Sequence, residues 1–122
     1  MNLVTPTVAA EYGASLPSWL QIVAPMQPQP TALTAYQLDA GEHSALALAL
    51  ELSDCFLILD DNAARRAANQ LALAFTGTAG LLVLAKKRGI IPAVRPLLEE
   101  LRTAGMWLSD QVAERVCRAA GE

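Results

Sequence analysis

Aromatic and charged side chains are scarce in this chain. Of its 122 residues, 5% are aromatic and 17% are charged, whereas 53% are hydrophobic. With so few aromatic rings, the core must consist mainly of Leu, Ala, Val and Ile, which suits helices packed closely on a layer of strands. We therefore expect an α or α/β fold rather than a β-sandwich, and the length predicts a single domain over residues 1–122.

Histidine and cysteine are nearly absent, which excludes several kinds of site. The only histidine, His43, rules out a metal site or a Ser-His arrangement that needs a second histidine, and we expect it to face solvent on a helix. Cys55 and Cys117 are too few and too far apart for a zinc motif, so we interpret both as small buried hydrophobic residues. The net charge of -3 argues against a surface that attracts nucleic acid everywhere, but a local basic patch is compatible with it.

Long apolar runs are also missing. The longest, residues 45–50 and 55–59, are far shorter than the roughly 20 residues that span a bilayer. Residues 1–10 lack the basic leader and the apolar segment of a signal peptide. We therefore expect a cytoplasmic protein that does not enter the membrane.

Short apolar runs alternate with amphipathic segments. The pattern predicts strands at 1–4, 21–23, 55–59 and 71–76, a helical turn at 17–20, and helices at 6–12, 39–52, 62–70, 78–88, 92–103 and 109–120. Thr5, Thr78 and Ser109 are the expected helix caps, and the prolines at 25, 28 and 30 exclude a regular element there. We expect the strand at 55–59 to be covered on both faces and Trp19 and Trp107 to pack in the core. This order predicts a mostly parallel sheet flanked by helices.

Candidate functional acids lie at element boundaries. Asp60 and Asp61 follow a predicted strand, where α/β sheets present functional side chains, and adjacent carboxylates there could hold a divalent cation. The alternative is structural, with one of them capping the next helix and Asp61 pairing with Arg65. Glu42 shares the apolar face of its helix, and it has the capping-box spacing from Asp39.

A second group of candidates could contact a phosphate. The segment 76–80 (TGTAG) joins a strand to a helix and could present backbone N–H groups and hydroxyls, including that of Thr78, although a simple glycine-rich turn explains it too. Lys86, Lys87 and Arg88 end the following helix. They could contact nucleic acid, or they could only complement the negative end of the helix dipole.

Several segments taken together resemble a known family. They are residues 41–49 (GEHSALALA), 57–61 (LILDD) with 63–68, 76–78 (TGT), 85–92 (AKKRGIIP), and the stretch from 94 to 110. As a set they are similar to an uncharacterised PIN-like family related to VapC-type toxin ribonucleases, over nearly the whole chain. The resemblance implies a Rossmann-like three-layer fold and phosphodiester hydrolysis by clustered acids that hold Mg²⁺ or Mn²⁺.

The resemblance also assigns the acids and points to a gap. It makes Glu11, Glu42, Asp61 and possibly Asp60 the metal ligands, whose bound cation would activate water. The family's amino-terminal strand, which carries an Asp-Thr-Ser-like segment, has no counterpart here, so the fold is expected to be truncated and to expose apolar surface. We therefore expect a homodimer or larger oligomer, or a partner such as an antitoxin that supplies the missing strand.

Three functions are compatible with the sequence. The first is a metal-dependent ribonuclease of toxin–antitoxin type that acts on RNA, or an inactive relative of one. The second is a non-catalytic interaction module that completes its sheet with a partner or a second copy. The third interprets residues 92–104 and 109–120 as a helix-turn-helix, which the preceding alternation of strands and helices disfavours.

Overall fold

The computed structural model describes residues 1–122. Their contacts divide the chain into two compact units, residues 1–76 (unit 1) and 77–122 (unit 2), and each is described by itself. Unit 1 holds short parallel strands and helices, whereas unit 2 is helical. The expected α/β class is confirmed, and no helix is long and apolar enough to cross a membrane.

A short helix connects the two strands of the first pair in unit 1. Strands β1 (Asn2–Val4) and β2 (Leu20–Ile22) are parallel, with Asn2 opposite Leu20. Helix α1 (Pro6–Tyr12) begins where the Oγ1 of Thr5 accepts the N–H of Val8 at 3.2 Å, and it ends at Gly13, whose φ of 70° suits glycine. Both helix ends confirm the sequence prediction.

A proline-rich connection then leads to the second half of unit 1. The carboxylate of Glu51 accepts the N–H groups of Met26 at 3.0 Å and Gln27 at 2.7 Å, which anchors this connection to the end of a helix. It closes in a short 3-10 turn, η1 (Thr31–Leu33), whose Leu33 is fully buried. An irregular backbone segment is thus held in place by one side chain and one apolar anchor.

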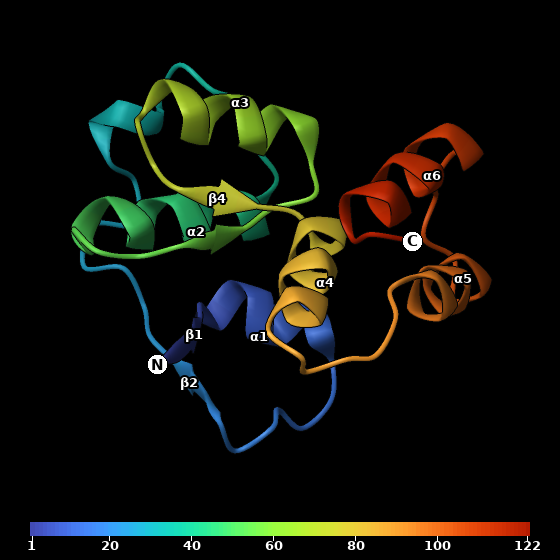
Figure 1. Ribbon diagram of the computed structural model, residues 1–122. Coiled ribbons are helices and arrows are strands. Elements are labelled where there is room, and N and C mark those ends of the chain that lie inside the picture. Colours follow the sequence, from blue (N-terminus) through green and yellow to red (C-terminus); the bar gives the residue numbers. More distant parts are fainter. The chain divides into compact units, whose positions relative to one another are not determined.

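The second half of unit 1 is built around another strand pair. Its elements are α2 (Ala40–Glu51), β3 (Leu57–Ile58), α3 (Asn62–Gln70) and β4 (Phe75–Thr76). Strands β3 and β4 are parallel, and α2 and α3 contact them and each other (Figure 1). The strands are shorter than predicted. Leu71 ends α3, and Ala72 has a φ of 58°, so the chain turns at these residues instead of extending.

The core of unit 1 consists of leucine and alanine. Its buried members come from η1, α2, α3 and the end of β3: Leu33, Leu46, Ala47, Leu59, Ala64, Ala67 and Ala68. The alanines of α3 lack bulk and allow its close contact with α2. This is the leucine and alanine interior that the shortage of aromatics predicts.

The strands of unit 1 form two separate two-stranded sheets instead of one continuous sheet. Each strand is therefore hydrogen-bonded on one side only. Apolar side chains are exposed on both pairs, with Ile22 at 56%, Phe56 at 60% and Ile58 at 54%. The prediction that the segment 55–59 is covered on both faces was wrong, because nothing within unit 1 covers its second face.

Unit 2 contains three helices. They are α4 (Thr78–Lys87), α5 (Arg95–Thr103) and α6 (Asp110–Ala119), packed around Val94, Leu98, Ala113 and Cys117. The cap at Ser109 is confirmed, since its Oγ accepts the N–H of Val112 at 3.2 Å. The interpretation of Cys117 as a small buried residue is also confirmed, whereas Cys55 is half-buried.

Three sequence predictions on helix ends and tryptophans were wrong. The cap of α4 is Gly77, and Thr78 is its first residue. Helix α5 begins at Arg95 rather than Pro92. Pro96 lies in its first turn, where an N–H would have no partner within the helix, so the missing N–H of proline costs nothing there. Trp19 and Trp107 are 63% and 86% exposed, so neither packs in the core.

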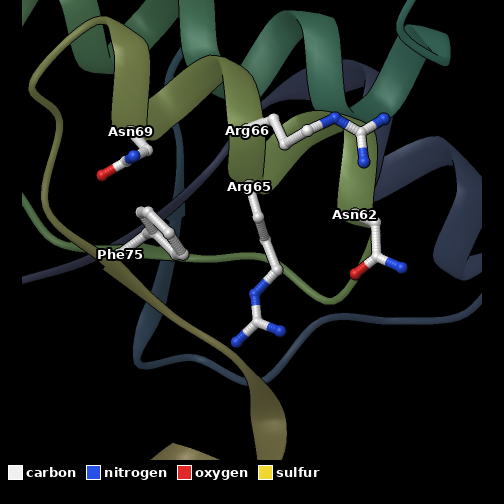
Figure 2. Close-up of a pocket in the computed structure, with 5 residues that line it drawn as sticks. All are labelled: Asn62, Arg65, Arg66, Asn69 and Phe75. Atoms are coloured by element: carbon white, nitrogen blue, oxygen red, sulfur yellow. The ribbon is translucent and has the colours of Figure 1, made fainter.

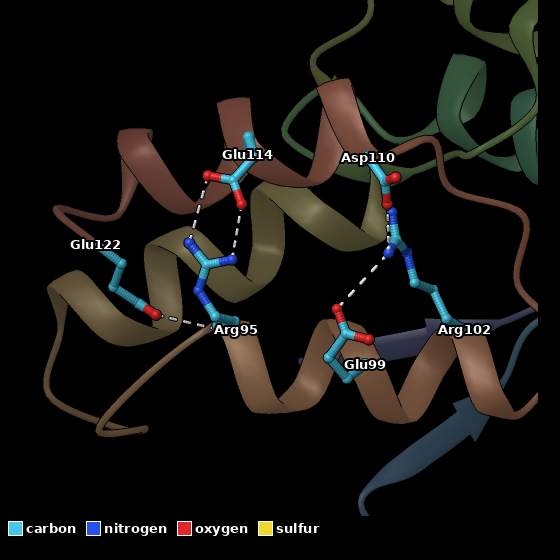
Figure 3. Close-up of polar contacts among 6 residues, drawn as sticks. All are labelled: Arg95, Glu99, Arg102, Asp110, Glu114 and Glu122. Carbon is cyan, nitrogen blue, oxygen red and sulfur yellow. Dashed lines mark hydrogen bonds and ion pairs between the residues drawn. The ribbon is translucent and has the colours of Figure 1, made fainter.

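Glu122 joins two helices of unit 2. Its carboxylate accepts the N–H of Val94 at 2.6 Å and, as Figure 3 shows, that of Arg95 at 3.1 Å, at the start of α5. It also pairs with the Nζ of Lys86 on α4 at 3.0 Å. The backbone N–H of Val94, followed by the Lys86 ammonium, lowers the pKa of Glu122 from 4.5 to about 2. The ionised carboxylate therefore stabilises the start of α5.

The Glu122→Gln variant should lose stability in a pH-dependent way. A carboxyl whose pKa is lower in the folded state stabilises the fold above its unfolded pKa and loses this contribution as the pH falls toward the folded value. The loss on substitution should therefore be complete at pH 7 and shrink between pH 4.5 and about 2. Urea unfolding at several pH values measures it. Glu114→Gln, which removes an exposed partner of Arg95, is the control and should lose less.

Candidate functional site: acids at two helix starts and an arginine-lined hollow

Asp60 and Asp61 lie between β3 and α3, at the carboxyl end of the strand, as the sequence predicts. Asp61 Oδ2 accepts the N–H of Ala64 at 2.9 Å, so Asp61 is the N-cap of α3. The structural alternative is thus confirmed for Asp61, but its ion pair with Arg65 does not form. Asp60 is exposed and also takes part in an interaction.

Glu42 lies half-buried in the first turn of α2. Asp39 is the N-cap residue by position, but its side chain makes no capping hydrogen bond. The capping box that the spacing of Asp39 and Glu42 allows therefore lacks its Asp39 hydrogen bond, and an acid from another helix lies against the first turn of α2. His43, next to Glu42, is half-buried instead of facing solvent freely.

That acid is Glu11 of α1. A Cβ on Gly41 would lie 2.9 Å from both carboxylate oxygens of Glu11, so the absence of a side chain at Gly41 lets this carboxylate rest on the first turn of α2. Helix starts favour anions, because their N–H groups and dipole are positive there. The structure thus brings Glu11 beside Gly41, the residue that precedes Glu42 in the first turn of α2.

The predicted metal ligands do not converge further. No three side chains of His, Cys, Asp or Glu come close enough together to hold a metal ion. Glu11 lies against the start of α2, whereas Asp61 is committed to capping α3. The acids as arranged do not fit a complete Mg²⁺ or Mn²⁺ site, since such ions need several oxygen ligands at once.

The predicted phosphate contacts all belong to α4 in unit 2. Thr78 begins this helix and is already engaged in an interaction, while Lys86, Lys87 and Arg88 end it. Lys86 is paired with Glu122 at 3.0 Å, whereas Lys87 and Arg88 are exposed. Their place at the helix end is consistent with complementing its dipole, and a role in binding stays a prediction.

Sequence reasoning missed a hollow on α3. Asn62, Arg65, Arg66 and Asn69 of this helix and Phe75 of β4 line an open cavity of about 360 Å³ (Figure 2). A sequence signal was available, because no lysine or arginine precedes Arg65 and no acid occurs between Asn62 and Leu98. The hollow is thus the first place along the chain where cations, an aromatic ring and amides occur together.

Parallel strands, intervening helices and acids at the end of a strand define an α/β domain, a class in which ligands gather at the carboxyl ends of the strands. A family model described as a PIN domain matches residues 3–122, so the chain belongs to the PIN-domain family. PIN domains generally use Mg²⁺ or Mn²⁺, and membership suggests a nuclease-like function. No curated protein and no solved structure shows a significant match.

Substitutions at Asp61 should separate its capping role from its charge. Asp61→Ala removes the hydrogen bond to the Ala64 N–H and should lower the free energy of unfolding by about 1 kcal/mol. Asp61→Asn keeps a good cap and should change stability by much less. Chemical denaturation of both variants measures the difference, and equal losses would contradict the capping role.

Proposed function

We propose that the chain is a cytoplasmic PIN domain of toxin–antitoxin type, a metal-dependent ribonuclease whose acids are assembled only when a further strand completes its sheet. The observation that carries the proposal is the division of unit 1 into two parallel strand pairs in a chain that matches the PIN family from residue 3 to residue 122. Family membership supports the nuclease class, and the open strand pairs support the need for completion.

The open edges of the strands support completion from outside the chain. β1 is paired only with β2, and β3 only with β4, so the other edge of β1 and of β3 retains unpaired backbone groups. Such edges readily take up another strand. A strand that pairs with both β1 and β3 would join the two pairs into one sheet and place its own side chains beside exposed apolar ones such as Ile58.

The added strand could also supply an acid. Ligands of α/β sheets gather at the carboxyl ends of strands, and a strand between β1 and β3 would end near the same edge as Asp60. Glu11 and Glu42 would supply the acids at the start of α2, and the bound cation would activate water and stabilise the phosphate. A second copy of this chain or an antitoxin protein is the proposed source of the strand.

One observation favours a second function, that of a non-catalytic interaction module. Asp61 caps α3, and no three acids converge in the chain. A domain that uses its acids for folding can retain the PIN architecture and bind a partner through its strand edges without cleaving RNA. Dependence on metal and on particular acids separates the two functions.

The Glu42→Gln variant tests the nuclease function. Cleavage of single-stranded RNA in Mn²⁺ should be abolished by a chelator and reduced about a hundredfold or more in Glu42→Gln, because a ligand and its charge are lost. Glu100→Gln, an exposed acid of α5 outside any ion pair, is the matched control and should cleave normally. Asp61→Asn tests the second acid without removing the cap.

The cleavage assay separates the two functions. Cleavage that persists in Glu42→Gln and Asp61→Asn would contradict the proposed acids. A native chain that binds its partner but cleaves no RNA with or without Mn²⁺ would establish the interaction module instead.

Assembly through the strand edges should be sensitive to charge. Ile58→Lys places a cation on the exposed side of β3, and lysine on an edge strand opposes pairing with another strand. We expect the native chain to sediment as a dimer or larger oligomer and the variant to shift toward monomer. Trp107→Lys, which changes an exposed apolar side chain in unit 2, is the control. An equal shift in both variants would contradict assembly through β3.

A further inference from the structure

Positive charge in unit 1 is confined to one helix. The acids of this unit are spread along its sequence, whereas its only lysine or arginine residues are Arg65 and Arg66 of α3. Neither arginine forms an ion pair, although carboxylates are plentiful in the unit. The ion pairs of Lys86, Arg95 and Arg102 lie in unit 2, and none of them involves Arg65 or Arg66.

Both arginines line the open hollow of about 360 Å³ described above. The amide side chains of Asn62 and Asn69 are exposed on its rim, and Phe75 forms part of its wall. Figure 2 shows Arg65 extending from α3 past Phe75, while Arg66 leaves the helix in a different direction. The hollow therefore offers cations, amides and an aromatic ring within one small area.

Arg65 lies against the ring of Phe75. Its guanidinium carbon lies 5.7 Å from the centroid of the Phe75 ring, a distance at which the ring attracts the cation. Its Nε is buried without a hydrogen-bond partner. A guanidinium held by a ring instead of by a carboxylate keeps its full charge and several of its donors for an anionic ligand.

Arg66 extends the surface toward a second aromatic ring. It also lines a neighbouring hollow of about 460 Å³, together with Ala35, Tyr36, Gln37, Leu38 and Ala63. Tyr36 is held there by a hydrogen bond of 2.7 Å from its hydroxyl to Gln70 Oε1. Arg66 thus lies between two hollows, each of which has an aromatic residue in its wall.

We propose that these adjoining hollows bind single-stranded RNA. Arg65 and Arg66 would contact phosphates, and a base would stack on Phe75 or on the guanidinium plane of Arg65. The amides of Asn62 and Asn69 would hydrogen-bond to base edges. An acidic peptide would match the arginines but would leave the ring and the amides without a role. The inference rests on the proposed function for RNA as the ligand, but binding requires neither metal nor cleavage.

Fluorescence anisotropy with a labelled oligouridine of about eight nucleotides tests the site. The full chain is used in a chelating buffer, so failure of cleavage cannot affect the result. Arg65→Gln and Arg66→Gln should each weaken binding about tenfold and reduce the slope of log affinity against log salt by about one. Phe75→Leu should weaken binding with the salt slope unchanged, because it removes stacking and no charge.

Arg115→Gln is the matched control, since it removes an exposed arginine of α6 that forms no ion pair. It should bind like the native chain, and circular dichroism of all variants checks that they are folded. Affinity of Arg65→Gln and Arg66→Gln equal to that of the control would overturn the proposal. Equal competition by polyglutamate and by unlabelled oligouridine would also overturn it, in favour of an acidic protein partner.

Discussion

The packing of α2 is the constraint on which the rest of unit 1 depends. This helix contacts α1, α3 and β3, and residues 46–49 are consecutively buried, so it is covered on several sides. The buried Thr5, which follows β1, is hydrogen-bonded to Ser44 of α2 at 2.7 Å and also caps α1. One hydroxyl therefore links the first strand pair, α1 and α2, while β3 is fixed to the same helix from the other side.

This dependence follows from the size of the strands. Pairs of two or three residues cannot be stable as isolated sheets, since each contributes few hydrogen bonds and little buried area. They persist because helices pack against them and because Leu33, Leu46 and Leu59 bury apolar surface between the elements. The acids follow from the same arrangement. Because Gly41 has no side chain, the Glu11 carboxylate can lie at the start of α2, whereas the Asp61 carboxylate caps the start of α3.

The sequence predicts local features such as helix caps well, but it predicts poorly which side chains are covered by other elements. Thr5 and Ser109 cap the starts of α1 and α6 as predicted, because capping depends on neighbouring residues alone. The capping box at Asp39 fails although its spacing is right, since spacing does not fix a side-chain rotamer. The exposure of Phe56 and Ile58 depends on what lies across the sheet edge, which hydropathy of one segment cannot show.

The candidate site was only partly predictable for the same reason. Glu11 and Glu42 are far apart in sequence, and it was the resemblance to the PIN family that associated them; the structure places Glu11 against Gly41, next to Glu42. The charge pattern singles out Arg65, but nothing in the sequence associates it with Phe75. They become neighbours because the chain reverses at Leu71 and Ala72, and this turn replaced the longer strand that the apolar residues predicted. The error in the strand and the missed hollow therefore have one cause.

The two proposed activities make different demands on the fold. The hollow with Arg65 and Phe75 uses only α3 and β4, which are complete within the second strand pair. Hydrolysis would need carboxylates from the start of α2 together with those that follow β3, and these acids do not converge in the chain by itself. RNA would therefore bind whether or not another strand is present, whereas cleavage would begin only when that strand joins the pairs. Such a division would place control of the chemistry in assembly and would leave recognition to a surface that assembly does not alter.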